Sequence, residues 1–231
     1  MDKQELNVLS FQAYGSNFIK KSGYSPDGLV QMAMQLASYR LFGKQVGTYE
    51  SSQVRPFLHG RTETTRSVSQ SSEAFVKAMG LRPKQNETIH SDIISLRKEK
   101  LSLLRDGTEY HSKYLKAAAG GYGVDRHFFG LSMLTGDNES DIPPLFSNPL
   151  FIRSKQWRLS TSTLPNKPGF GPVVEDGIGI GYEVQPDCCY FTITSRKTNN
   201  YTEAMSHLLE EALIEIQVLI DLDTPSPKSK L

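Results

Sequence analysis

The feature that most constrains the fold is a change of hydrophobic period near the C-terminus. In GIGIGYEV (177–184) every second side chain is apolar, and CCYFTITS (188–195) resumes the alternation after a turn at Pro186 and Asp187. This pattern predicts a hairpin of two strands. After the hairpin the period changes, and apolar residues follow helical spacing over four turns: Met205, Leu208, Leu209, Ala212, Leu213, Ile216, Leu219 and Ile220.

Strand and helix patterns also follow one another along the rest of the chain. LNVLSFQAYG (6–15) reads as a strand, and a helix is expected from Pro26, with Ser25 as its N-cap and Gly43 at its end. We further expect extended segments within 48–69, helices within 71–119 and 123–134, and loops over 135–157. The fold class is α/β, with mixed α+β order: one domain built on a central mixed β-sheet flanked by helices.

The composition is that of an ordinary globular protein. The chain has 231 residues, of which 38% are hydrophobic and 22% charged, with a net charge of +1. This balance gives no general attraction to nucleic acid or anionic membranes, and no stretch has the apolar length of a transmembrane segment. The two cysteines, Cys188 and Cys189, are expected to be reduced packing residues, with a redox role as the alternative.

The two ends of the chain carry different signals. MDKQELNVLS lacks the basic run and apolar block of a signal peptide. Two prolines follow Asp223, so residues 224–231 are expected to form a flexible tail. The last three residues, Ser229, Lys230 and Leu231, match the peroxisomal address that is read at a free C-terminus. A chance polar tail is the alternative.

A run of four hydroxyl residues lies in RLSTSTLP (158–165). In a strand, Ser160 and Ser162 share one face, while Thr161 and Thr163 share the other. A strand face made of serines packs poorly and has little hydrophobic reason to be buried. The pattern therefore indicates a functional use for two neighbouring hydroxyls.

Two further clusters are candidates for ligand binding. Lys20 and Lys21 precede a helix N-terminus, where free amides attract anions, so a phosphorylated ligand could bind there; a solvated lysine pair explains the same residues. Arg126 lies in an otherwise apolar helix and needs a partner. That partner is either a structural one, such as Asp125, or the carboxylate of a ligand, and the residues alone do not decide between them.

Four motifs in order resemble the choline/carnitine acyltransferase family. They are TYESSQVRPFLHGRTETTRS (48–67), GVDRHFFGL (123–131), LSTSTLP (159–165) and GFGPVVEDGIGIGY (169–182). The resemblance runs from about Phe11 to the end of the last helix. The wording is most similar to carnitine palmitoyltransferases of the mitochondrial inner-membrane type, with carnitine acetyltransferases close behind.

The resemblance implies that residues 1–223 form the C-terminal half of such an enzyme, with a CoA-dependent acyltransferase-like fold. In the family, the N-terminal half carries the catalytic histidine, followed three residues later by an acid and then by glycine. No histidine of this chain lies in that pattern, so the general base is expected on a missing N-terminal half. The histidines are His59, His90, His111, His127 and His207.

The resemblance also implies the reaction. A histidine takes the proton of the carnitine hydroxyl, and the oxygen attacks the thioester carbonyl of acyl-CoA. The tetrahedral oxyanion needs a preset donor. By resemblance, Ser162 donates that hydrogen bond and Ser160 helps to hold carnitine.

The remaining binding residues follow from the same resemblance. The carboxylate of carnitine is expected at Tyr49, Ser51 and Thr62, with Arg126 as charge partner. The trimethylammonium group is expected on the aromatic face of Phe170. Coenzyme A is expected at Lys20, Lys21, Ser25 and Asp27, although Ser16 replaces a lysine that is usual there. No metal is expected.

The sequence therefore predicts a carnitine O-acyltransferase half that is inactive without the histidine-bearing half. Pro168 and Gly169, at the place that closes the acyl channel in the family, favour medium or long acyl chains. Choline is the less favoured acceptor, because it has no carboxylate for Arg126. The alternative function is a non-catalytic module that binds carnitine, CoA or a partner protein. The tail favours a peroxisomal location, with the mitochondrion as the alternative.

Overall fold

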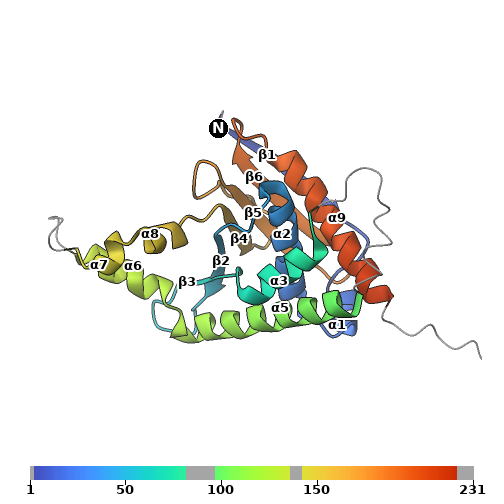
Figure 1. Ribbon diagram of the computed structural model, residues 1–231, viewed down its shortest axis with the longest axis horizontal. Coiled ribbons are helices and arrows are strands. Elements are labelled where there is room, and N and C mark those ends of the chain that lie inside the picture. The colour runs from blue at the N-terminus through green and yellow to red at the C-terminus, as the bar shows by residue number, and fades with distance from the viewer. Residues whose placement is uncertain (1–2, 82–96, 136–141, 223–231) are drawn as a thin grey trace, which may run out of the picture.

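The computed structural model describes residues 3–81, 97–135 and 142–222. Six strands form one sheet in the order β1-β6-β5-β4-β2-β3 (Figure 1). The strands are β1 (Gln4–Phe11), β2 (Thr48–Gln53), β3 (Thr62–Thr65), β4 (Leu159–Thr163), β5 (Ile178–Val184) and β6 (Cys189–Arg196). The central strand β4 is parallel to both neighbours, β2 and β5, and the other pairs are antiparallel. The expected mixed sheet is confirmed.

Helices account for most of the remaining described chain. They are α1 (Ser16–Lys21), α2 (Pro26–Phe42), α3 (Gln70–Met79), α5 (Arg97–Ala117), η1 (Ala118–Tyr122), α6 (Asp125–Met133), α7 (Pro144–Ser147), α8 (Pro149–Ser154) and α9 (Thr202–Asp221). None of the helices within the described ranges is both long enough and apolar enough to cross a membrane.

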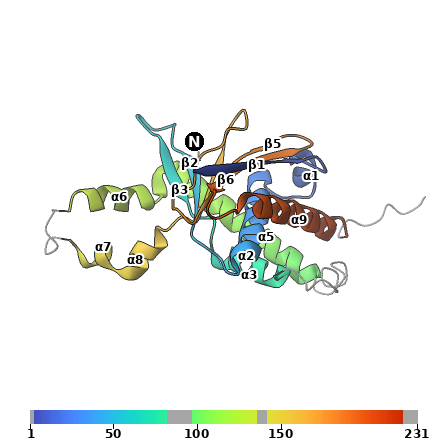
Figure 2. The same ribbon diagram turned by 90° about the horizontal axis from the view of Figure 1, so that it is seen from above.

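Helices α2, α3, α5 and α9 lie together on one side of the sheet (Figure 2). We call that side the covered face and the other the outer face. On the covered face, Leu159, Ile178, Ile180, Phe191 and Ile193 are fully buried. Alternation along the strands therefore places Tyr49, Ser51, Ser160, Ser162, Gly179 and Gly181 on the outer face.

Two helices of the covered face begin and pack as the sequence predicts. Ser25 caps α2 through the N–H of Gly28, and Gly43 ends it in the left-handed conformation. Helix α9 has the expected apolar stripe and packs beside α2. Arg40 of α2 binds both carboxylate oxygens of Glu215 on α9, at 2.6 and 2.8 Å. This buried fork fixes the two helices against each other.

The loop expected over 135–157 is wrong for its second half, because Pro144 and Pro149 start the short helices α7 and α8. Proline suits the first turn of a helix, where its missing N–H is not needed. Together α6, α7 and α8 form an arm that projects from the sheet (Figure 1). No residue of these three helices is buried. The rings of Phe128 and Phe146 pack on Phe151, at centroid distances of 5.7 and 5.5 Å.

The two cysteines are as expected, and some other expectations fall on residues that are not described. Cys188 is half-buried and Cys189 buried, and both are free thiols, as predicted. Residues 82–96 of the expected helical stretch (with His90), residues 136–141 of the expected loop, and the tail 224–231 lie outside the described residues.

Candidate functional site

The structure brings Arg126, Tyr49 and Thr62 together. Arg126 is the second residue of α6, and its Nη2 donates to the hydroxyl of Tyr49 at 2.9 Å. Its Nε donates to the carbonyl oxygen of Thr62 at 3.1 Å, and Nη2 also reaches the Thr62 hydroxyl at 3.4 Å. Among the described residues Nη1 has no hydrogen-bond partner, and the side chain is exposed. The guanidinium is thus held in place with one edge open.

Asp125, the expected structural partner of Arg126, is bonded to another residue. Asp125 binds Arg66 and not Arg126, through bonds of 2.9 Å to Nε and 2.6 Å to Nη2. Arg66 also stacks over Trp157 at 4.6 Å, and the Trp157 ring meets that of Tyr49 edge-on at 5.9 Å. The charge of Asp125 is therefore paired elsewhere, and the guanidinium of Arg126 is bound by neutral groups only.

The two serines of β4 share the outer face, as the alternation predicts. Ser160 pairs with Tyr49 of β2 on one side and with Gly179 of β5 on the other. Ser160 is buried and Ser162 half-buried. On the other face Thr161 is fully buried and accepts a hydrogen bond from Gln31 at 3.0 Å. Both serines therefore lie on a strand that is hydrogen-bonded along both edges.

Phe170 lies over β5 and β6 rather than beside Arg126. Its carbonyl oxygen accepts a hydrogen bond from the hydroxyl of Thr194, and the carbonyl of Lys167 accepts one from Thr192 at 2.9 Å. The segment 167–171 packs flat on the outer face because β5 has glycine there. A Cβ on Gly179 would lie closer than 3.0 Å to the carbonyl oxygen of Phe170, a distance that real Cβ atoms essentially never show.

The four residues expected to bind coenzyme A do not all point the same way. Lys20 and Lys21 are exposed in the last turn of α1. Ser25 caps α2. The carboxylate of Asp27 is turned toward the interior, where it accepts a hydrogen bond from the hydroxyl of Tyr182 at 2.6 Å.

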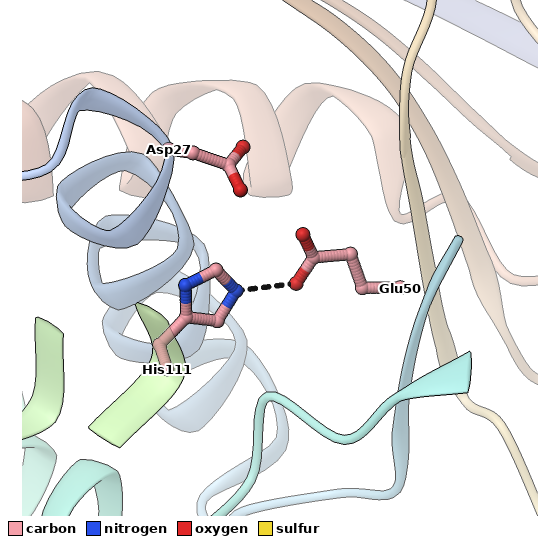
Figure 3. Close-up of side chains that lie close together, drawn as sticks. All are labelled: Asp27, Glu50 and His111. Atoms are coloured by element: carbon pink, nitrogen blue, oxygen red, sulfur yellow. Dashed lines mark hydrogen bonds and ion pairs between the residues drawn. The ribbon is translucent and has the colours of Figure 1, made fainter. Parts of the chain in front are cut away.

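A second polar cluster, on the covered face, was not expected from the sequence. His111 of α5 and Glu50 of β2 are hydrogen-bonded at 2.6 Å, and each side chain is 2% exposed (Figure 3). Ser67 donates to the same Glu50 oxygen at 3.0 Å. Asp27 completes the group, since one ligand atom of each of Asp27, Glu50 and His111 lies within 4.8 Å of the others. These types can bind a metal ion, but the direct histidine–glutamate hydrogen bond already uses two of them.

Burial and pairing act against each other in this cluster. Burial raises the pKa of Glu50, and the hydrogen bond and positive charge of His111 offset this only in part. Burial disfavours the charged form of His111, but the hydrogen bond and negative charge of Glu50 outweigh it and raise the pKa of His111. Since Glu50 follows Tyr49 directly, the pair holds β2 from the face opposite to Ser160.

The other described histidines lie at the surface. His59 is exposed in the turn between β2 and β3, and His127 is exposed on α6. His207 pairs with Glu211 one turn away on α9, at 3.2 Å. His111 lies on the covered face, so the sheet separates it from the serine pair of β4.

The matching family model and the similar curated proteins indicate the same family. A family model described as choline/carnitine O-acyltransferase matches residues 1–211. Carnitine O-acetyltransferase of Columba livia is 37% identical over 230 residues, which are 97% of this chain and 34% of that protein. The mitochondrial carnitine O-acetyltransferase of Saccharomyces cerevisiae is 36% identical, over 93% of this chain and 31% of the relative. Choline O-acetyltransferase of Rattus norvegicus is 34% identical, over 96% and 35%.

The chain therefore spans about a third of the length of the curated relatives that it matches. Among solved structures, a wax ester synthase/diacylglycerol acyltransferase from Marinobacter aquaeolei VT8 is 10% identical, with a TM-score of 0.39 over 94% of this chain and 49% of the other.

Proposed function

The chain belongs to the choline/carnitine O-acyltransferase family, and we propose that it carries the acceptor-binding part of a carnitine O-acyltransferase. The reaction is acyl transfer between acyl-CoA and the hydroxyl of carnitine. One observation carries the proposal: Arg126 is bonded to Tyr49 and Thr62 on the side of the sheet that presents Ser160 and Ser162.

Recognition of a carboxylate fits the open edge of Arg126. A guanidinium fork binds carboxylates in two-point fashion, and neutral partners leave its charge available for the ligand. The hydroxyls of Tyr49 and Thr62 add polar contacts around it, and Ser51 lies two residues from Tyr49 on the same face of β2. Choline lacks the carboxylate, so this arrangement favours carnitine as the acceptor.

The serine pair has the rigidity that an oxyanion donor needs. Strand β4 is paired with β2 as far as Thr161, and Ser162 itself is paired with Gly181 of β5, so Ser162 keeps its place when charge develops on the thioester oxygen. In the proposed cycle the carnitine oxygen attacks the thioester carbon, Ser162 donates to the oxyanion, and the C–S bond breaks. The proton passes from the carnitine hydroxyl to a histidine and on to the CoA sulfur. That histidine is assigned to the part of the family's chain outside these 231 residues.

Two further ligand contacts belong to the proposal. Phe170 remains the candidate for the trimethylammonium group, by cation–π contact. Lys20, Lys21 and Ser25 remain the candidates for coenzyme A. The carboxylate of Asp27 is already bonded to Tyr182. The proposed contact of Asp27 with coenzyme A therefore depends on its place in the first turn of α2.

The length of the acyl group is a separate part of the proposal. The expected medium or long chain depends on space beside Gly169. A Cβ at Gly169 would lie 2.7 Å from the methyl group of Thr192 and 3.6 Å from Leu6. These distances describe the room for a Cβ on Gly169 and not an acyl channel, so a medium or long acyl chain stays the proposal. Comparing acetyl-, octanoyl- and palmitoyl-CoA as donors tests this.

Location is proposed from the last three residues, which favour the peroxisome, with the mitochondrion as the alternative. The yeast relative is named as mitochondrial. A fluorescent protein fused to the N-terminus, with and without residues 229–231, separates the two by microscopy.

Activity is tested by release of CoA thiol from acetyl-CoA and carnitine. The chain is assayed alone, and then with a separately expressed histidine-bearing segment of the pigeon relative. We expect turnover only from the mixture. Turnover by the chain alone would contradict the assignment of the base to another segment. If the mixture is inactive but the chain binds carnitine, the non-catalytic module is the better account.

A further inference from the structure

Thr62 and Glu63, which are neighbours on β3, bind the side chain and the backbone of Arg126, respectively. Thr62 binds the guanidinium, while the carboxylate of Glu63 accepts the backbone N–H of Arg126 at 3.2 Å. The same carboxylate accepts the N–H of Thr64 at 2.6 Å. Glu63 is 7% exposed. Its buried charge is therefore stabilised by backbone amides.

The amide of Arg126 belongs to the first turn of α6, where N–H groups have no partner within the helix. Val124, the residue before the helix, provides no capping hydrogen bond. Negative charge near a helix N-terminus is stabilising. Glu63 thus supplies the cap of α6 from a strand that is distant in sequence.

Gly123 makes room for this carboxylate. A Cβ on Gly123 would lie closer than 3.0 Å to the side chain of Glu63. The backbone of Gly123 has φ −69° and ψ 154°, which any residue adopts. The glycine is therefore needed for the approach of Glu63 and not for its own conformation.

Within the described ranges, helix α6 is fixed to the body of the molecule mainly by polar contacts. None of its residues is buried, so apolar packing contributes little to its position. The polar contacts at its first turn are those of Glu63, the fork between Arg66 and Asp125, and the bonds of the Arg126 guanidinium to Tyr49 and Thr62. Without Glu63, the start of α6 loses the contact that holds the backbone of Arg126, and only the fork of Asp125 and the side-chain bonds of Arg126 remain.

We propose that Glu63 is a positioning residue for Arg126, and through it a determinant of selectivity for acceptors that carry a carboxylate. Glu63 itself does not contact the ligand of Arg126, because its carboxylate is bonded to the backbone N–H groups of Thr64 and Arg126. The inference rests on the proposed function in one respect, namely that the ligand of Arg126 is the carboxylate of carnitine.

The experiment uses nitrogen-15 NMR on the whole chain. Two variants disturb the contact in different ways: Glu63→Ala removes the carboxylate, and Gly123→Ala displaces it. Glu73→Gln is the matched control, because Glu73 pairs with Lys77 on the exposed surface of α3. Solvent exchange of the Arg126 Nε–H reports its position, and titrations with L-carnitine and with choline report selectivity.

In both Glu63→Ala and Gly123→Ala we expect the Arg126 Nε–H to exchange about tenfold faster, and carnitine to bind about tenfold more weakly. Choline binding and the control variant should not change. Unchanged exchange and an unchanged carnitine-to-choline ratio in both variants would overturn the inference. If the wild-type chain binds no carnitine, the proposed ligand is wrong, while the exchange of Nε–H still decides whether Glu63 positions Arg126.

Discussion

His111 of α5 and Glu50 of β2 meet at 2.6 Å behind the strand whose outer face presents Tyr49. The contact joins a helix to the sheet at the residue next to the candidate site. A buried ion pair contributes little net stability, but removing one partner is costly because the other charge is left without compensation. The pair therefore lies directly behind Tyr49, and losing either partner would leave a buried charge at that point of β2.

The first prediction concerns stability and pH. The pKa of His111 is raised, so the stabilisation that its protonated form provides is complete below the ordinary value of 6.5 and is lost as the pH rises through the raised pKa. The raised pKa of Glu50 acts in the same sense from 4.5 upward. Urea unfolding should give a free energy that falls above pH 6.5 in the wild type and stays flatter in the double variant Glu50→Gln/His111→Gln, because removing His111 alone would raise the pKa of Glu50 further. Equal pH slopes in the two proteins would contradict this.

A second prediction concerns the segment 167–171. In Gly181→Ala, the new Cβ would meet the carbonyl oxygen of Pro168 closer than 3.0 Å, so the segment or the strand must move. We expect a loss of about 1–3 kcal/mol in the free energy of unfolding. Gly130→Ala is the control, because a Cβ there meets nothing within 4 Å and lies in a helix. Calorimetry should show a lower Tm for the first variant and no loss for the second.

The third prediction concerns the two thiols. Burial, and then the neighbouring Cys188, raises the pKa of Cys189 to about 12, so Cys189 stays protonated and unreactive at pH 8. Half-buried Cys188 should react with a disulfide reagent first. Native protein should therefore release one equivalent, and Cys188→Ser none on the same timescale. Rapid reaction of two thiols in the folded chain is the opposing result.

The fourth prediction concerns Ser162 in the assembled enzyme. Removing one oxyanion donor typically lowers kcat by roughly 10²–10³-fold, and we expect that loss for Ser162→Ala. Ser10→Ala, an exposed serine on β1, serves as the control and should keep full turnover. KM for carnitine should change little, because the hydrogen bond forms mainly in the transition state. An unchanged kcat in Ser162→Ala would remove this residue from the mechanism.

Part of this fold and site could be predicted from the sequence because the signals are local. Ser25 and Pro26 begin a helix by capping and fixed φ, and alternation places Ser160 and Ser162 on one face. The motif resemblance named Tyr49, Thr62 and Arg126, and the structure brings those three together. In each case a short stretch of chain carries the information.

The rest depends on contacts between distant elements. His111 and Glu50 belong to different elements, and no local pattern links a histidine in a mid-chain helix to a strand glutamate. Glu63 and the backbone of Arg126 are equally far apart in the sequence. The sequence does not reveal the short helices α7 and α8, because prolines such as Pro144 and Pro149 also mark loops, and only the packing of Phe151 shows which applies here.

The central claim is that Arg126 binds the carboxylate of a zwitterionic acceptor, and titration calorimetry of the chain with L-carnitine tests it most directly. We expect saturable binding to the wild type, binding at least about tenfold weaker to Arg126→Ala, and no change in Arg153→Ala, which removes an exposed arginine of α8. Equal carnitine affinity in the wild type and in Arg126→Ala would contradict it.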